Sequence, residues 1–560
     1  MNDLQKRAKE LSLDFLENEK QYRLGFVEAE KSNPLTKNLG ETFVKDTTAG
    51  VEMLLSVDNA LISPITDAVF SPEFLQFYSA VINTLKGGGR IVISGCGSTG
   101  RLAMRIEASW RQAIEALAGT VEGLSDYKDK IIEVMTGGDY AVIRSVESFE
   151  DYAALGAMQV RELGITEKDL LIGVTATAET TSILGSAKEA LSLGADVWMI
   201  ICTSPDLVRK RLARAEEVFS NERTKSIYIK CGPFAVSGSS RMQSSTSEQL
   251  VISLALEIAL AELMGERVSV RERAEDFILG FKECIALLTD ERSVAIMSRA
   301  IDKECTLYQR GGYVTYFADE YILDVLTDTT ERSPTFTTPP FRPQKRKGEA
   351  LSWAFVKNPC LNTPEAWNAC FARVPRCIDK TDAEYLALGV KIEDVKRIPK
   401  ISLDAILEYE IGKEPDAERE GEGNLAVWID FKNSPVPEFF KASKKYGESF
   451  ELVLGRDKEF PHKTRLKIFE HIAVKLMLNT VSTGTMAKMG RVRGNYMVHL
   501  NISNKKLIDR ATRIISELAC VSYERANYEL FLTKLDLEER RIEKSTTIAT
   551  LERLINRKKD

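Results

Sequence analysis

Glycines and hydroxyl-bearing residues are clustered at one junction of the sequence where a phosphate group could be held. The stretch SGCGSTGRLA, Ser94–Ala103, follows an apolar run and leads into a helical pattern. Gly97 and Gly100 would let the backbone close around an anion, and Ser98 and Thr99 supply hydroxyl donors at the helix start. A tight turn between strand and helix explains the glycines but not the hydroxyls. Because no lysine follows the last glycine, the pattern is not that of a nucleotide-binding Walker A loop.

Two further loops carry similar chemistry. VTATAETTS (Val174–Ser182) and VSGSSRMQSSTSEQ (Val236–Gln249) each follow an apolar run and lead toward a helical pattern. Taken singly, each is typical of an ordinary helix cap. Three such loops after parallel strands can nevertheless converge at the carboxyl edge of one sheet, where ligands bind in open α/β folds. The ligand-binding candidates in these two loops are Thr175, Thr177, Glu179, Ser239, Ser240 and Arg241.

A parallel sheet would place these loops together. Short apolar runs alternate with amphipathic segments from residue 90 to about 264, a pattern that predicts an α/β doubly wound core with helices on both faces of the sheet. The predicted strands are RIVISG, IIEVMTGG, LLIGVTA, VWMIICTS and SIYIKCG.

A second set of apolar runs predicts a second, less regular α/β core. Its strands are GYVTYFADE, LSWAFVKN, NLAVWIDFKN and FELVLGR, and the proline-rich segment TFTTPPFRPQKRKGE interrupts any regular helix after the first of them. We therefore expect four parts. They are an N-terminal helical segment (1–85), a first domain (86–270), a second domain (271–465) and a helical C-terminal segment or lid (466–560).

The composition excludes several classes of protein. With 76 basic and 82 acidic residues the net charge is −6, which gives no field that would attract nucleic acid or an anionic membrane. The nine cysteines form no CxxC pair, which favours a cytoplasmic location. None of the three histidines lies near a cysteine or an acidic cluster at ligand spacing, so we expect neither a metal nor another cofactor. No apolar run approaches the roughly 18 residues of a membrane span.

Four motifs in combination resemble the sugar isomerase (SIS) domain family. They are GCGSTGRLA, VSGSSRM, NTVSTGTMAKMGRVRGNYMVHL (Asn479–Leu500) and SNKKLIDRA (Ser503–Ala511). The resemblance is to the branch that contains N-acetylmuramic acid 6-phosphate etherase and the glucokinase regulatory protein. EKSNPLTKNL (Glu30–Leu39) resembles the N-terminal signature of the regulatory protein. This resemblance implies two tandem SIS domains with a helical C-terminal lid.

The resemblance also implies a site shared between the two domains. Etherases use one glutamate as a base and another as an acid, and the matching motifs VESFED and TDTTERSPTF place Glu150 and Glu331 at these positions. Lys506 matches the lysine of the lid. In the second domain the phosphate loop reads YFADEYILD, where Asp319 and Glu320 would repel a phosphate, so we expect one site per chain.

Two departures from the etherase pattern bear on function. Glu179 and Gln243 stand where etherases carry cationic side chains, which weakens the case for a substrate with a lactyl carboxylate. We favour a cytoplasmic protein similar to the regulatory protein, which binds a hexose or hexosamine 6-phosphate and has a sugar kinase as a possible partner. The first alternative is an etherase, a carbon–oxygen lyase that releases lactate by means of Glu150 and Glu331. The second is an aldose–ketose isomerase, which would need one base able to serve two adjacent carbons.

Overall fold

The first half of the chain forms a five-stranded parallel sheet. The computed structural model describes residues 3–144, 146–456, 461–500, 502, 504–542 and 544–556. The strand order is β2-β1-β3-β4-β5, and every pair is parallel. All five strands overlap the predicted apolar runs: β1 (Ile91–Gly95), β2 (Ile131–Met135), β3 (Leu170–Thr175), β4 (Asp196–Ile201) and β5 (Thr224–Tyr228).

The strand order defines where a ligand is expected to bind. The chain passes from β1 to β2 on one side and returns to β3 on the other side of β1. At such a switch point the connections leave in opposite directions, so a crevice opens at the carboxyl ends of the two strands. Both β1 and β3 are buried along their whole length, as expected for strands covered on two faces.

The second half forms a four-stranded parallel sheet with the order β7-β6-β8-β9. Its first strand again lies between the second and the third, as in the first sheet, which supports the predicted tandem arrangement. All four strands overlap the predicted segments, although the last two begin a few residues earlier: β6 (Val314–Phe317), β7 (Ala354–Lys357), β8 (Gly421–Phe431) and β9 (Tyr446–Leu454). A two-residue hairpin that the sequence pattern does not predict, β10 (Val492–Arg493) with β11 (Tyr496–Met497), follows them.

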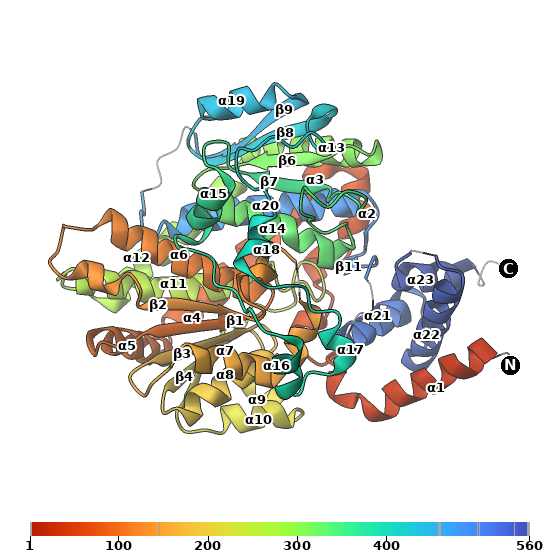
Figure 1. The fold of residues 1–560 in the computed structure, drawn as a ribbon, viewed down its shortest axis with the longest axis horizontal. Coiled ribbons are helices and arrows are strands. Elements are labelled where there is room, and N and C mark those ends of the chain that lie inside the picture. Colours follow the sequence, from red (N-terminus) through yellow and green to blue (C-terminus); the bar gives the residue numbers. More distant parts are fainter. Residues whose placement is uncertain are drawn as a thin grey trace.

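Helices flank both sheets, as predicted (Figure 1). Those of the first half are α5 (Pro72–Lys86), α6 (Ser98–Ala116), α7 (Ala153–Glu162), α8 (Thr181–Ser192), α9 (Pro205–Arg209), α10 (Ala213–Phe219) and α11 (Gln243–Leu263). Those of the second half are α12 (Val270–Leu288), α13 (Glu291–Gln309), α14 (Ile322–Phe336), α15 (Thr363–Phe371), α16 (Asp382–Ala387), α17 (Ile392–Val395), α18 (Leu403–Leu407), α19 (Pro437–Ser443) and α20 (Ile468–Lys488).

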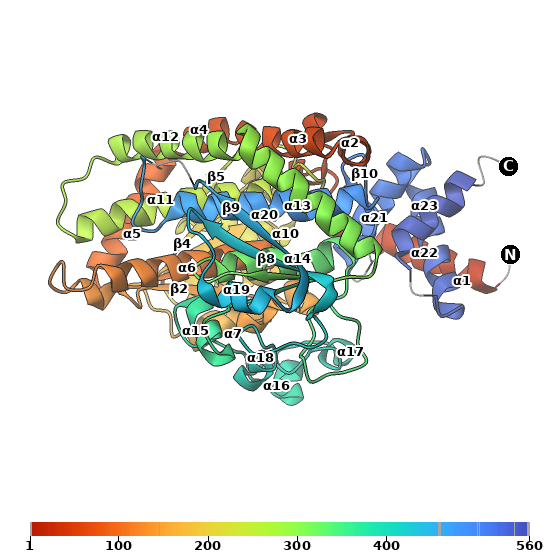
Figure 2. The same cartoon turned by 90° about the horizontal axis from the view of Figure 1, so that it is seen from above.

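Two long helices, α11 and α20, run through the middle of the molecule (Figure 2). Both are buried along nearly their whole length. A helix without a polar face is stable only when it is surrounded by protein, so these two form the centre of the core. We had placed α20 in the C-terminal segment from residue 466, but it packs on α13 and α14 instead.

The predicted helical C-terminal unit is present and starts after residue 504. It comprises α21 (Lys505–Leu518), α22 (Tyr523–Glu539) and α23 (Thr546–Asn556), and it lies at one end of the molecule (Figure 1). The N-terminal helix α1 (Asp3–Asn18) packs on α22, with Phe15 against Phe531. The other N-terminal helices, α2 (Leu39–Lys45), α3 (Thr47–Ala60) and α4 (Ile62–Val69), contribute to the main hydrophobic core instead.

Three properties of the whole chain bear on its chemistry. All nine cysteines are free. Within the described ranges, no group of three or more histidine, cysteine, aspartate or glutamate side chains could hold a metal ion. No single described helix has the length and apolarity needed to cross a membrane, and one pair bent by 70°, Thr47–Val69 with Pro72–Lys86, meets those two criteria only when taken together.

Candidate functional site

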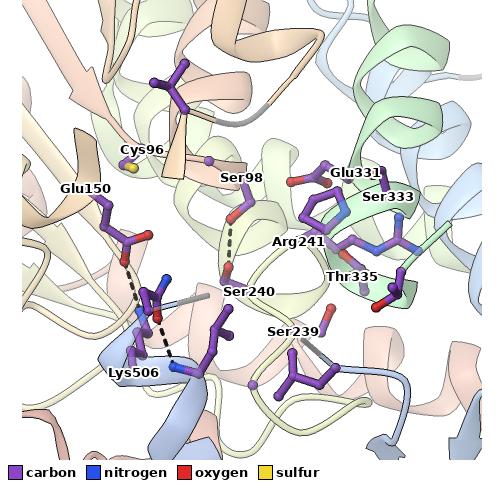
Figure 3. A pocket seen from close by; sticks show the side chains of 18 of the residues that line it. Cys96, Ser98, Glu150, Ser239, Ser240, Arg241, Glu331, Ser333, Thr335 and Lys506 are labelled. Carbon is purple, nitrogen blue, oxygen red and sulfur yellow. Dashed lines mark hydrogen bonds and ion pairs between the residues drawn. The ribbon is translucent and has the colours of Figure 1, made fainter. Parts of the chain in front are cut away.

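A cavity of about 1250 Å³ lies where the two halves of the chain and the C-terminal unit meet. Its walls come from the loops after β1, β2, β3 and β5, from α14 and the segment that follows it, and from α21. Figure 3 shows side chains from these elements pointing toward one another. The predicted site residues that line the cavity are Gly97, Ser98, Thr99, Glu150, Thr175, Thr177, Ser239, Ser240, Arg241, Glu331 and Lys506.

The loop after β1 presents Ser98 to the cavity. Gly97 immediately precedes α6 with φ of 56° and ψ of −119°, a backbone conformation that residues with a Cβ rarely adopt. The Thr99 hydroxyl donates to the Cys96 carbonyl (3.0 Å) and accepts from the Cys96 N–H (2.9 Å), so it closes the loop. The two adjacent hydroxyls therefore have different partners, and Ser98 is the one that reaches across the cavity wall.

Gly100 does not line the cavity, in contrast to our expectation for a ligand-binding residue. A Cβ at this position would lie 2.8 Å from the side chain of Met135 on β2. The glycine therefore allows α6 to pack closely on the sheet, which is the structural role that a tight turn alone would predict.

The loop after β5 meets the loop after β1. The hydroxyl oxygens of Ser240 and Ser98 are 2.8 Å apart, although the residues are 142 positions apart in the chain. The guanidinium of Arg241 bonds to Asp328 (3.2 Å) and Ser482 (2.7 Å), so it joins this loop to α14 and α20. Two hydroxyl-bearing loops that precede α6 and α11 thus form one wall (Figure 3).

The loop after β3 uses its hydroxyls internally. Thr175 and Thr180 share a hydrogen bond of 3.0 Å, and the Thr177 hydroxyl donates to Glu179 over 3.2 Å. Glu179 is buried and, unlike the threonines, does not line the cavity. It lies behind the wall and acts on the cavity through its ion pairs.

An ion network extends from the cavity surface to Glu179 and includes the predicted lysine of the lid. The ammonium of Lys506 is 3.4 Å from Glu150 and 3.2 Å from Glu179, and Glu179 also pairs with Arg214 at 2.7 Å. Burial lowers the pKa of Lys506, but the carboxylates of Glu179 and Glu150 outweigh it and raise that pKa above its ordinary value. Burial likewise raises the pKa of Glu179, and Lys506 and Arg214 outweigh it, so the net shift is downward. Lys506 and Glu179 are therefore ionised at neutral pH.

Asp151 is a cavity residue that the sequence did not indicate. Burial, followed by the charge of neighbouring Glu150, raises the pKa of Asp151 to about 6. A carboxylate that titrates near neutral pH changes the charge of the cavity over a physiological range.

The second predicted glutamate, Glu331, comes from α14 in the other half of the chain. Its side chain lines the cavity and is 12% exposed. One carboxylate oxygen lies 3.8 Å from the guanidinium of Arg101. In Figure 3, Glu150 and Glu331 lie on opposite sides of the cavity with Ser98 between them. The fold thus brings both glutamates to one cavity, as a site shared between the two halves requires.

Sequence reasoning also missed Arg510 and Glu30, which both line the cavity. Arg510 pairs with Glu30, with N···O distances of 2.5 and 3.0 Å, and its guanidinium packs against Gly238, where a Cβ would lie 2.5 Å away. The sequence contained one signal for Arg510, because it lies four residues after Lys506 and so shares a face of the predicted helix with that lysine.

The loop after β1 and its surroundings match a known family. The family described as glucokinase regulatory protein N-terminal SIS domain matches residues 73–191, which contain β1 to β3 and the glycine–hydroxyl loop. The first half of the chain therefore contains a SIS domain. This confirms the resemblance on which the predicted architecture rests.

Relatives of this SIS protein include N-acetylmuramic acid 6-phosphate etherases. That of Aliivibrio fischeri strain MJ11 is 28% identical over 211 residues, which cover 37% of this chain and 63% of the relative. That of Yersinia pestis strain Pestoides F is 28% identical over 242 residues, which cover 43% of this chain and 72% of the relative. The chain thus spans less than two thirds of the length of the first of these relatives.

Among solved structures, the SIS protein is similar to tagatose-6-phosphate ketose/aldose isomerase from Escherichia coli, with a TM-score of 0.44 and 10% identity. That match covers 83% of this chain and 97% of the isomerase. It is also similar to the C-terminal domain of glucosamine-fructose-6-phosphate aminotransferase from Francisella tularensis. There the TM-score is 0.42 with 10% identity, and the match covers 79% of this chain and 97% of that domain.

The second half of this SIS protein carries a different loop at the equivalent strand end. After β6, the side chain of Asp319 accepts a hydrogen bond from Asn358 (2.9 Å), and Glu320 pairs with Lys467. Neither acidic residue lines the cavity. Carboxylates in this position oppose an anionic ligand.

Proposed function

We propose that this protein binds a hexose or hexosamine 6-phosphate in the cavity between its two halves. One observation carries the proposal: the loops that precede α6 and α11 meet at Ser98 and Ser240, 2.8 Å apart, on one cavity wall. Hydroxyls and backbone N–H groups near the start of a helix form a site for a dianion, and the positive end of the helix dipole favours that charge. The phosphoryl group would bind to Ser98, Ser239 and Ser240.

The sugar would lie between the two glutamates. Glu150 and Glu331 face the cavity from opposite sides, and Lys506 lies beside Glu150. Carboxylates accept hydrogen bonds from sugar hydroxyls, and an ammonium donates to them. The proposal thus assigns the serine hydroxyls to the phosphate and the charged side chains to the sugar hydroxyls.

A panel of ligands tests the proposal. The purified protein would be mixed with sugar 6-phosphates, including N-acetylmuramic acid 6-phosphate, and with the matching unphosphorylated sugars, and its melting temperature would be measured. We expect a rise in melting temperature with the phosphorylated compounds alone, because a ligand that binds only the folded state stabilises it. Equal shifts with the unphosphorylated sugars would contradict the assignment of the phosphate loop.

An etherase is the second candidate, and two observations favour it. Both predicted catalytic glutamates line the cavity, and the relatives quoted above are etherases. Against it, the two cationic positions of the etherase pattern are lost: Glu179 is paired with Lys506, and the buried Gln243 amide donates to Asp58 over 2.8 Å. A lactyl carboxylate would therefore lack the two cations that the etherase pattern supplies.

Release of lactate separates the two candidates. A binding protein forms no lactate from N-acetylmuramic acid 6-phosphate. In a lyase, Glu150→Gln or Glu331→Gln would leave binding largely intact and reduce turnover by a factor of about 10² to 10⁴, as expected for loss of a positioned acid or base. Lactate release that Glu150→Gln abolishes would contradict the proposed binding function and establish the lyase.

Two further parts of the proposal concern the cellular context. We propose a cytoplasmic location, which the nine free cysteines support. We also propose a sugar kinase as a partner, on the resemblance to the regulatory protein alone. Co-purification with and without a sugar 6-phosphate tests this part, and a partner whose binding ignores the ligand would contradict it.

A further inference from the structure

Arg101 connects three segments that form the cavity, although it does not line the cavity itself. It stands in the first turn of α6 and is buried. Its guanidinium donates to the carbonyl of Val142 (3.1 Å) in the segment that leads to Glu150, and it lies 3.8 Å from the carboxylate of Glu331 on α14. One side chain thus contacts the helix of the phosphate loop, the segment before one glutamate and the other glutamate.

The position of Arg101 separates it from the ligand. The side chain lines a second, much smaller cavity of about 30 Å³ behind the phosphate loop, and Ser98 and Glu331 line both cavities. No other ion pair or hydrogen bond of the Glu331 side chain is found in the described part of the chain. Any effect of Arg101 on a ligand would therefore pass through its neighbours, and Glu331 is the acidic neighbour with which it forms an ion pair.

We propose that Arg101 is a positioning residue for Glu331. The inference rests on the proposed function, because it assumes that Glu331 contacts the bound sugar phosphate. In the described residues Arg101 is the cation within ion-pair distance of the Glu331 carboxylate, and its removal would leave Glu331 with the more distant charge of Lys475. Without Arg101, Glu331 would turn away from the ligand or become neutral, and the ligand would lose a hydrogen-bond acceptor.

Arg105 provides a matched control one turn further along α6. Its side chain is 5% exposed, compared with 7% for Arg101, and it lies 3.7 Å from Asp324 on the same helix, α14. Both arginines line the smaller cavity, but Asp324 does not line the larger one. Loss of either arginine removes a similar buried ion pair, and only loss of Arg101 affects a residue at the ligand.

The test combines four single variants and one double variant with calorimetric titration of glucose 6-phosphate and measurement of the melting temperature. We expect Arg101→Gln and Glu331→Gln each to weaken affinity about tenfold, and the double variant to bind no more weakly than the weaker single variant. Arg105→Gln should lower the melting temperature as much as Arg101→Gln does and change affinity by less than about twofold. Arg101→Lys keeps the charge but spans fewer partners, so we expect an intermediate loss of affinity with a near-normal melting temperature.

The outcomes distinguish a positioning role of Arg101 from a purely structural role and from a direct effect of its charge. Equal loss of affinity in Arg101→Gln and Arg105→Gln would show a structural role only, and additive losses in the double variant would show that Arg101 acts through its own charge. Either result overturns the inference. If Arg101→Gln does not fold, unchanged affinity in Arg101→Lys also overturns it. A parent protein that binds none of the sugar 6-phosphates would instead contradict the proposed function.

Discussion

At the scale of single residues, neighbouring hydroxyls in the loop after β1 have different tasks. Thr99 bonds to both backbone groups of Cys96 and so fixes the shape of the loop, whereas Ser98 points across the cavity wall to Ser240. Gly97 supplies the backbone conformation and Gly100 supplies packing space. The motif therefore divides into residues that shape the loop and one side chain that is available to a ligand.

Ser98→Ala should weaken binding of glucose 6-phosphate about tenfold, because a hydrogen bond to a charged group contributes roughly 1.5–3 kcal/mol. Calorimetric titration measures this directly. Ser192→Ala, at the exposed end of α8, is the control and should bind like the parent protein. Equal affinity in Ser98→Ala and the parent would remove this hydroxyl from the phosphate site.

Asp151 should give ligand binding a dependence on pH. Its pKa is raised to about 6, so the side chain gains negative charge as the pH rises from 5 to 7, and this charge opposes an anionic ligand. The phosphate of the ligand also titrates near pH 6, but this affects binding to both proteins equally and so cancels in the ratio of their affinities. Asp151→Asn should thus bind the ligand as tightly as the parent protein at pH 5 and a few-fold more tightly above pH 6. A ratio that stays constant from pH 5 to 7 would contradict this role.

At the scale of elements, α21 ties the C-terminal unit to the site. Lys506 pairs with Glu150 and Glu179, and one turn further on Arg510 pairs with Glu30 of the N-terminal segment. The carboxylate of Glu30 also binds Arg513 at 2.6 Å. Burial raises the pKa of Glu30, but the two arginines outweigh it and hold that pKa well below its ordinary value. The helix is thereby held between the N-terminal segment and the loops of the first half.

Glu30→Gln should loosen α21. Loss of the charge leaves two arginines without their buried carboxylate, at a cost on the order of 3 kcal/mol. If α21 opens locally, hydrogen exchange of its amides should accelerate about a hundredfold, whereas exchange in β1 and β3 should not change. Glu28→Gln, which removes only an exposed pair with Lys31, should leave exchange as in the parent protein. Unchanged exchange in Glu30→Gln would show that other contacts hold the helix.

The strands could be predicted from the sequence, and the pairing of distant segments could not. Each strand is a short apolar run between loops, so local pattern is sufficient to find it. The β10–β11 hairpin has two residues per strand, too few to produce a pattern. Helix α20 is buried on nearly all sides although it carries many polar residues, so its sequence did not distinguish a core helix from part of a C-terminal lid. Glu30 and Arg510 are 480 positions apart, and only the folded chain brings them together.

The cavity could be predicted in outline because motifs mark its loops, whereas its charges required the structure. Ser98, Ser239 and Ser240 follow apolar runs, and the carboxyl ends of parallel strands meet at one edge. The titration of Asp151 depends on burial and on Glu150, and neither the burial nor the distance is written in local sequence. The ion pair of Arg101 with Glu331 likewise connects α6 and α14, which flank different sheets and are distant in the sequence.

At the scale of the whole molecule, two sheets with related strand order share one proposed ligand site. The loop after β1 carries glycine and hydroxyls, whereas the equivalent loop after β6 carries Asp319 and Glu320, which are committed to Asn358 and Lys467. The second half contributes Glu331 to the site of the first instead of a second phosphate loop. The arrangement therefore predicts one ligand for each chain.

Calorimetric titration of the full chain tests the central claim most directly. We predict saturable binding of a hexose or hexosamine 6-phosphate with a stoichiometry of one per chain, and no measurable binding of the same sugar without its phosphate, because the loops after β1 and β5 recognise the dianion. Absence of binding for every sugar 6-phosphate, or equal binding of the unphosphorylated sugar, would contradict the proposed function. Two equivalent sites per chain would contradict the assignment of the site to the first half alone.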